Sequence, residues 1–204
     1  MSFLLAALAG YLLGSVNCAI VLVKLRFHKD VRASGSGNAG ATNVGRTYGS
    51  VFGVLTLLGD MLKAVLAGWA GYLLAGRSGM VIADLFCILG HCWPLYFRFR
   101  GGKGMAVAAG TLLLLDWRLL IVIVVFFAVV FVCWRRVSLC TVLSVVIFPP
   151  LYYWHQGTAD LTLAVGTLIC LIIIFQHRQN IKRLIAGTEP KFTLPSRKGK
   201  EGEK

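Results

Sequence analysis

The chain has 204 residues, of which 57% are hydrophobic and 14% charged, with a mean hydropathy of +0.77 and a formal net charge of +13. This composition excludes an ordinary soluble globular protein and indicates an integral membrane protein. The positive charge lies in short segments between apolar runs, which fits orientation in a bilayer better than nucleic-acid binding, so we expect no nucleic-acid partner.

Seven apolar segments are candidates for membrane-spanning helices, because about 20 apolar residues are needed to cross roughly 30 Å of hydrocarbon. They cover residues 2–23, 51–75, 80–97, 105–115, 117–134, 138–154 and 160–176. The fourth is short, yet a break at Asp116 places Lys103 and Arg135 on the same side of the bilayer. We therefore predict an all-α, polytopic transmembrane helix bundle of about seven spans. Residues 1–192 would form a single domain, followed by a charged tail at 193–204.

The distribution of basic residues predicts the orientation of these spans. If the N-terminus is outside, 18 of the 21 Lys and Arg residues lie on the cytoplasmic side, including the tail residues Arg197, Lys198, Lys200 and Lys204. Such an excess of cytoplasmic positive charge is the positive-inside pattern. We expect the N-terminus outside and the C-terminus in the cytoplasm.

A glycine-rich polar loop at residues 34–43 interrupts the apolar sequence and is followed by Arg46. Glycine permits positive φ and lets successive backbone N–H groups point to one place, while Ser, Thr and Asn add donors. These features favour a site for an anion such as phosphate, with a flexible surface loop as the alternative. The candidate binding residues are Ser36, Gly37, Asn38, Gly40, Thr42, Asn43 and Arg46.

A second polar segment joins residues 90–94 to a Gly-Gly-Lys-Gly turn at 101–104. The turn is expected to expose N–H groups beside Lys103, where the positive end of the next helix points. It is not a nucleotide-binding P-loop, because GxxxxGK[ST] is not met. A basic anchor at the lipid headgroups is the alternative. The candidates are His91, which could equally be structural, Gly101, Gly102 and Lys103.

The third polar segment covers residues 177–184. His177, Asn180 and Arg183 are spaced i, i+3, i+6 and therefore lie on roughly one helical face, with Gly187 predicted as the C-cap. These side chains could converge on one ligand, whereas a polybasic helix that binds acidic lipid heads is the alternative. All three polar segments lie on the same predicted side of the membrane, which favours one shared site for phosphate.

Charged residues also occur inside the predicted spans, where unpaired charge is costly. We expect Asp60 and Lys63 to face protein, and Lys63 to pair with Asp84. A small transporter or channel with these three residues along its pathway is an alternative function. The cysteines show no ordered metal-ligand spacing, so we expect no metal.

The three polar segments together resemble the integral membrane acyl-phosphate:glycerol-3-phosphate acyltransferases of bacterial phospholipid synthesis. The resemblance rests on GSGNAGATN at 35–43 with Arg46, on GHxxP at 90–94 joined to GGKG, and on HRxNIxRLxxGxE at 177–189. It covers most of the chain. Asn17 and Cys18 depart from the Pro-Phe pair that the family is expected to have.

The resemblance implies transfer of a fatty acyl group from acyl phosphate to the 1-hydroxyl of glycerol 3-phosphate, giving lysophosphatidate and phosphate. An acyl phosphate is already activated, so we expect neither a serine nucleophile nor a cofactor. The implied catalytic residues are His177, Asn180, Lys103 and Arg46, and Ser138 and Arg183 join the substrate-binding residues named above. The proton acceptor is left open among His177, His91 and a phosphate oxygen of the donor.

The resemblance also implies a cellular location and an oligomeric state for the protein. The enzyme would lie in the inner membrane of a bacterial cell, surrounded by lipid, with its active site facing the cytoplasm, and the expected state is a monomer. His155 and Asp160 match the HxxxxD pattern of another glycerol-phosphate acyltransferase class. Because the predicted topology places them on the side opposite the basic segments, we interpret that match as a coincidence.

Overall fold

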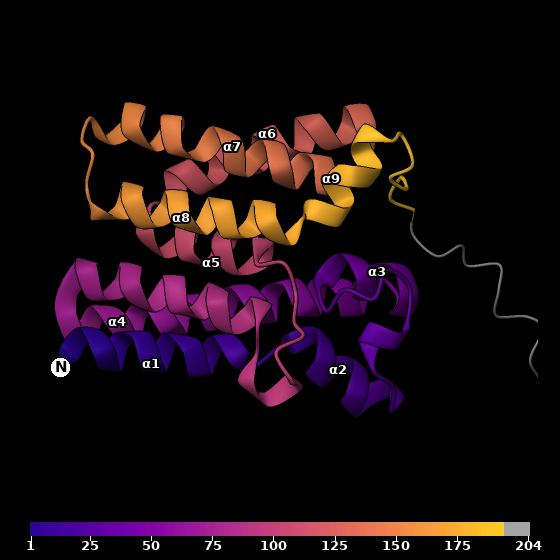
Figure 1. Cartoon of the computed structure of the whole chain (residues 1–204), viewed down its shortest axis with the longest axis horizontal. Coiled ribbons are helices and arrows are strands. Elements are labelled where there is room, and N and C mark those ends of the chain that lie inside the picture. Colours follow the sequence, from indigo (N-terminus) through magenta and orange to yellow (C-terminus); the bar gives the residue numbers. More distant parts are fainter. Residues whose placement is uncertain (194–204) are drawn as a thin grey trace, which may run out of the picture.

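The computed structural model describes residues 1–193, and among these residues it contains helices and no strands (Figure 1). The α-helices are α1 (Ser2–Ser15), α2 (Cys18–Phe27), α3 (Ala41–Tyr48), α4 (Ser50–Cys92), α5 (Met105–Leu115), α6 (Trp117–Trp134), α7 (Val137–Gln156), α8 (Leu161–Gln176) and α9 (Arg178–Ile185), with short 3-10 turns at Val31–Ala33 and Leu95–Phe97. The tail residues Arg197, Lys198, Lys200 and Lys204 lie outside the described residues.

The predicted helical membrane architecture is confirmed. Four helical stretches are long and apolar enough to cross a membrane, and α8 with α9, bent by 61°, would make a fifth. They are Ser2–Phe27, Ser50–Phe97, Trp117–Trp134 and Val137–Gln156. The boundary between α5 and α6 lies at Asp116, as predicted. The Asp116 side chain caps the start of α6 by accepting a hydrogen bond from Arg118 N at 3.0 Å. By length and composition the count is four or five, so seven crossings stay a prediction.

Helix α4 reverses direction part-way and forms a hairpin of two limbs (Figure 1). Ala75 and Gly76 have non-helical backbone angles, with φ of +60° at Gly76, a conformation that glycine adopts without strain. The limbs correspond to the predicted spans 51–75 and 80–97, the second of which ends at Cys92 rather than residue 97. A Cβ atom on Gly10 or Gly14 of α1 would overlap the α4 backbone, so glycine lets these helices approach closely.

The first predicted span, residues 2–23, is not one continuous helix. It breaks after Ser15, and α2 starts at Cys18 and continues to Phe27. Asn17 causes this start, because its side-chain oxygen accepts a hydrogen bond from Ile20 N at 3.1 Å. Its amide donates to the carbonyl of Ala39 at 3.2 Å, and so joins the helix break to the glycine-rich loop. The departure from Pro-Phe is thus accommodated by a polar cap.

The expected pair between Lys63 and Asp84 is wrong. The Lys63 ammonium instead lies 2.9 Å from a carboxylate oxygen of Asp60 and 2.9 Å from Nδ1 of His91. It also donates to the carbonyls of Gly14 and Val16, at 3.0 and 2.7 Å. Asp60 is one turn from Lys63 on the same limb, whereas Asp84 projects elsewhere. The buried charge therefore ties the end of α1 to both limbs of α4.

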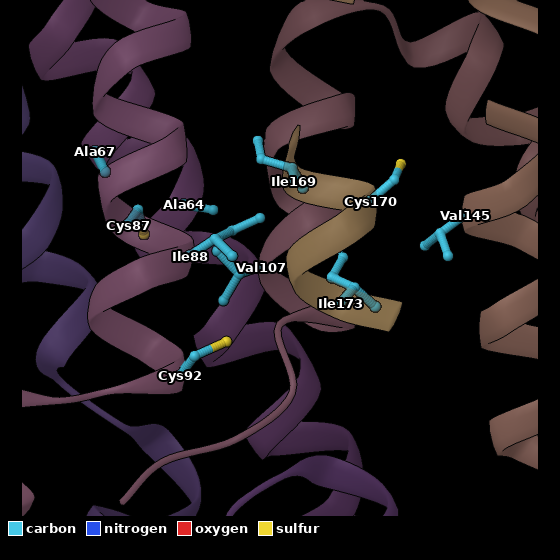
Figure 2. Close-up of a cluster of buried hydrophobic side chains, with 10 residues drawn as sticks. All are labelled: Ala64, Ala67, Cys87, Ile88, Cys92, Val107, Val145, Ile169, Cys170 and Ile173. Atoms are coloured by element: carbon cyan, nitrogen blue, oxygen red, sulfur yellow. The ribbon is translucent and has the colours of Figure 1, made fainter. Parts of the chain in front are cut away.

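Apolar side chains fill the space between the α4 hairpin, α5 and α8. Figure 2 shows Ala64, Ile88 and Val107 grouped beside Ile169 and Ile173 of α8. All five are less than one tenth exposed. This contact holds α8, and the bend that follows it, at a defined position relative to the segment before α5.

Candidate active site

The three polar segments lie at the same end of the bundle, opposite the N-terminus (Figure 1). The first two are in contact, because a Cβ atom on Gly102 would overlap both the carbonyl oxygen of Ala39 and the ring of His91. Arg32 strengthens this contact by donating to the carbonyls of Phe97 and Arg100, at 2.8 and 3.1 Å. The second and third segments meet where the Lys103 ammonium donates to the side-chain oxygen of Asn180. The predicted convergence is confirmed.

The centre of the site is a group of five side chains, which we call the polar network. Its hub is Glu189, of which one carboxylate oxygen accepts hydrogen bonds from Asn180 Nδ2 at 2.7 Å and Ser138 Oγ at 2.6 Å. The other oxygen accepts from Arg183 Nε at 2.7 Å. Lys103 completes the network through Asn180. One carboxylate therefore fixes groups from α7, α9 and the loop before α5.

The turn after α9 brings Glu189 into this position. The helix ends at Ile185 with Ala186 as its cap, one residue before the predicted Gly187. Gly187 follows with φ of +72°, and the N–H groups of Thr188 and Glu189 both donate to the carbonyl of Arg183, at 2.8 and 3.1 Å. The chain thus folds back along α9, and only because of this turn does the Glu189 side chain meet Asn180 and Arg183, which lie about one turn apart on that helix.

The charges of the network influence one another. Burial lowers the pKa of the Lys103 ammonium to about 8, an effect that the Glu189 carboxylate opposes and Arg183 assists. Burial alone would raise the pKa of the Glu189 carboxyl, but the hydrogen bonds from Ser138, Asn180 and Arg183 outweigh it, so this pKa lies below its ordinary value. At neutral pH the network therefore combines a carboxylate with two cations.

His177 lies at the bend between α8 and α9 and is buried. Its Nδ1 atom is 2.8 Å from the carbonyl oxygen of Ile173. A carbonyl oxygen only accepts hydrogen bonds, so Nδ1 carries the hydrogen and Nε2 is left as the acceptor of the neutral ring. The predicted common face is confirmed for Asn180 and Arg183, which both reach Glu189, while His177 has a separate partner.

The glycine-rich loop has the predicted backbone form at two positions, with φ of +60° at Gly35 and +73° at Gly37. Asn43 organises the loop. Its buried amide nitrogen lies 3.2, 3.0 and 3.0 Å from the carbonyls of Val31, Ser34 and Asn38, and its oxygen accepts from Ser36 N at 2.9 Å. Because these bonds occupy its polar atoms, Asn43 shapes the loop from inside.

Other candidates in this loop lie toward its surface. Ser36 and Gly37 are exposed, whereas Asn38, Gly40 and Thr42 are half-buried. Arg46 lies one turn beyond Thr42 on α3, and its guanidinium carbon is 5.9 Å from the centre of the Phe192 ring. Its buried Nε donor has no hydrogen-bond partner among the described residues. Buried donors are normally paired, so the Nε donor of Arg46 is an exception to this rule.

The second segment differs from the prediction in one respect. The N–H groups of Gly101 and Gly102 do not face a ligand, because they donate to the carbonyls of Cys92 and His91 at 3.1 and 3.0 Å. These bonds instead shape the turn that presents Lys103. His91 is 2% exposed and belongs to the buried group with Asp60 and Lys63. The structure therefore places His91 behind the turn.

Glu189 is a site residue that was not predicted from the sequence, although it ends the third motif at residues 177–189. A signal was present, since Glu189 is the single acidic residue between positions 176 and 193 in a segment rich in Lys and Arg.

His155 and Asp160 have other partners: His155 Nε2 is 3.0 Å from Asp116 Oδ2, and Asp160 accepts a hydrogen bond from Leu163 N at the start of α8. No group of acidic, His and Cys side chains suited to a metal ion occurs within residues 1–193.

Comparison with known proteins identifies the family. The family model described as glycerol-3-phosphate acyltransferase matches residues 4–187. The chain belongs to the glycerol-3-phosphate acyltransferase family. The acyltransferase of Pseudomonas fluorescens is 43% identical over 195 residues, covering 93% of this chain and all of the relative. That of Syntrophotalea carbinolica is 40% identical, covering 94% of this chain and 98% of the relative.

Two solved structures of a family member agree with this assignment. Both are crystal structures of PlsY (YgiH), an integral membrane glycerol 3-phosphate acyltransferase. Its glycerol 3-phosphate form has a TM-score of 0.88 and 33% identity, and its lysophosphatidic acid form 0.86 and 32%. Each likeness covers 95% of this chain and 96% of the other. The chain is thus a glycerol-3-phosphate acyltransferase with the PlsY membrane fold, and a role in phospholipid synthesis follows from the family.

Proposed function

We propose that this acyltransferase uses acyl phosphate as its donor and transfers the acyl group to the 1-hydroxyl of glycerol 3-phosphate, releasing lysophosphatidate and phosphate. The observation that carries the proposal is that Lys103 of the polar network lies two residues before Met105, which lines one end of a cavity of about 320 Å³. Both substrates have phosphate groups, and Lys103, Arg183 and Arg46 supply the cations to hold them. The PlsY structures in glycerol 3-phosphate and lysophosphatidic acid forms support the acceptor and the product.

The cavity suits a fatty acyl chain. It runs beside α5 and α8, from Met105 and Ile173 at the end near the network to Leu115 and Thr162 at the other. Met105 follows Lys103 by two residues, and the carbonyl of Ile173 holds His177. A chain in the cavity would therefore have its carbonyl carbon near the ammonium of Lys103 and the His177 ring.

Direct transfer needs no covalent enzyme intermediate, because an acyl phosphate is a mixed anhydride with a good leaving group. The 1-hydroxyl oxygen bonds to the acyl carbon, the bond from that carbon to the phosphate oxygen breaks, and the hydroxyl proton goes to the departing phosphate. Lys103 and Arg46 would stabilise the charge that develops, and Asn180 and His177 would orient the acceptor. Ser36, Asn38 and Thr42 would add donors at the loop surface. His91 is a poor proton acceptor here, since it lies in the buried charged group.

Purified protein supplied with acyl phosphate and glycerol 3-phosphate is expected to release phosphate and lysophosphatidate in equal amounts. Acyl-coenzyme A is expected to give no product. Asn180→Ala should lower turnover, whereas Lys182→Ala, which changes an exposed residue on the same helix, should not. Phosphate release and product would be followed together. No turnover with acyl phosphate, combined with solute flux in liposomes, would support the alternative of a small transporter.

We also propose that the chain crosses the bacterial inner membrane seven times, with its N-terminus outside and its active site in the cytoplasm. The two limbs of α4, the short helix α5 and the α8–α9 pair would each cross the membrane, although helix length alone does not identify each of them as a separate span. In a variant without reactive native cysteines, Ser36→Cys and Lys182→Cys should react with an impermeant reagent only from the cytoplasmic side. Gly157→Cys, in the loop between α7 and α8, should react only from outside, and the reverse pattern would refute this topology.

A further inference from the structure

Helix α8 presents a glycine to the cavity. Gly166 lines the cavity together with Phe148 of α7, and both residues are half-buried, so each keeps accessible surface. A Cβ atom on Gly166 would lie 2.6 Å from Cε1 and 3.2 Å from Cζ of the Phe148 ring. The first distance is too short for any side chain. The Phe148 ring therefore packs directly against the backbone of α8, and glycine at position 166 permits this contact.

The Phe148 ring is also held by a buried neighbour. Tyr152, one turn further along α7, has its ring centre 5.8 Å from that of Phe148. Tyr152 is 2% exposed, and its hydroxyl lies 3.2 and 3.1 Å from the carboxylate oxygens of Asp160, the residue that caps α8. Because Tyr152 is fixed in this way, a larger residue at position 166 would push the Phe148 ring into the cavity or enter the cavity itself. In either case the cavity becomes narrower.

The contact between Phe148 and Gly166 lies deep in the bundle. Helices α7 and α8 run side by side (Figure 1), so its depth can be measured along either helix. Phe148 follows Ser138 by ten residues and Gly166 precedes His177 by eleven, which gives roughly 15 and 16 Å at about 1.5 Å per residue. An extended chain advances about 1.2 Å per bond, so about 13 carbon atoms fit above this contact. The cavity continues roughly 6 Å further, to Thr162.

We infer that Gly166 is the residue that admits long acyl chains, because it keeps the cavity open at the depth of the Phe148 ring. This inference rests on the proposed function, which identifies the cavity as the acyl-chain site. Small residues in membrane helices commonly serve close packing. Here the neighbour that approaches the glycine is a side chain that lines the cavity, so the size of residue 166 also determines the length of chain that fits.

The test compares lauroyl, palmitoyl and stearoyl phosphate as donors. The wild-type enzyme should use palmitoyl phosphate at least as well as lauroyl phosphate. Gly166→Leu should keep its kcat/KM for lauroyl phosphate and lose on the order of tenfold for the two longer donors, the usual scale of overpacking. Ala164→Leu is the matched control, because Ala164 is exposed on the same helix and does not line the cavity. The Gly166→Leu/Phe148→Ala double variant, which removes the ring, should recover the longer donors.

A second measurement does not depend on turnover. Lauroyl and palmitoyl lysophosphatidate are compared by the rise they cause in the midpoint of thermal unfolding. The palmitoyl compound should give the larger rise with wild-type protein and should lose this advantage with Gly166→Leu. Gly166→Ala adds a single methyl group, so it should fold even where Gly166→Leu does not, and it should change both readouts in the same direction by a smaller amount.

A wild-type chain-length profile in every Gly166 variant that folds, Gly166→Ala included, would overturn the inference. Absence of turnover with every acyl phosphate, together with the expected thermal pattern, would uphold the inference and contradict the proposed donor alone.

Discussion

Replacing Lys103 with Met is expected to lower kcat/KM for acyl transfer by about 100-fold or more, as is typical when a group that stabilises transition-state charge is removed. The Lys103 ammonium is the cation that the Gly-Gly-Lys-Gly turn presents to Asn180, next to the end of the cavity. Lys182→Ala is the matched control, because Lys182 is exposed on α9 and should contribute little. A Lys103→Met enzyme as active as this control would contradict the proposed site.

The pH dependence of the wild-type enzyme gives a further readout of Lys103. Since its pKa is lowered to about 8, the ammonium is fully charged below about pH 7 and loses its proton as the pH rises through 8. The value of kcat/KM, which reports the free enzyme, should therefore fall above pH 8. Bound phosphate favours the charged form, so the corresponding fall in kcat should occur at higher pH. Lys103→Arg should abolish this fall, because a guanidinium stays charged throughout the range.

Replacing Glu189 with Ala is expected to cause the largest combined loss of stability and activity. The carboxylate accepts hydrogen bonds from Ser138, Asn180 and Arg183, so its removal leaves three donors without their partner. We expect a loss of roughly 2–4 kcal/mol in the free energy of unfolding, seen as a lower thermal midpoint. Activity should also fall by about 100-fold, because Asn180 then no longer holds Lys103 in place.

Glu189→Gln separates the charge from the hydrogen bonds. Its amide oxygen can still accept from Ser138 and Asn180, but the negative charge that raises the pKa of Lys103 is lost. The thermal midpoint should fall less than in Glu189→Ala, and the alkaline fall in kcat/KM should begin below pH 8. Asp30→Asn is the control, since it removes an exposed pair with Arg32 that is expected to contribute less than about 1 kcal/mol. An unchanged pH profile in Glu189→Gln would show that Glu189 and Lys103 are not coupled.

Local features of the sequence determined much of the fold. Hydropathy and length located the apolar helices, and the ends of α5 and α6 followed from one capping residue, Asp116. The convergence of the three polar segments was also predictable, because the positive-inside pattern assigns each loop to a side of the membrane without any knowledge of packing. Motif resemblance then supplied the family and the candidates Lys103, Asn180 and His177.

Side-chain partners could not be predicted in the same way, because they depend on which faces of distant helices meet. Lys63 pairs with Asp60 and His91 rather than Asp84, since the α4 hairpin brings His91 to this position and turns Asp84 toward the cavity. Asn43 is a loop organiser because its neighbours fold around it.

The sequence by itself determined that this is a helical membrane acyltransferase with its polar segments gathered on one side, because hydropathy, charge bias and motifs are each contained in short stretches of chain. Only the tertiary structure decided that Glu189 is the hub of the site and that the Lys63 ammonium pairs with Asp60 and His91. Both features combine atoms from distant parts of the chain, and the relative rotation and depth of the helices that carry them are set by packing throughout the bundle.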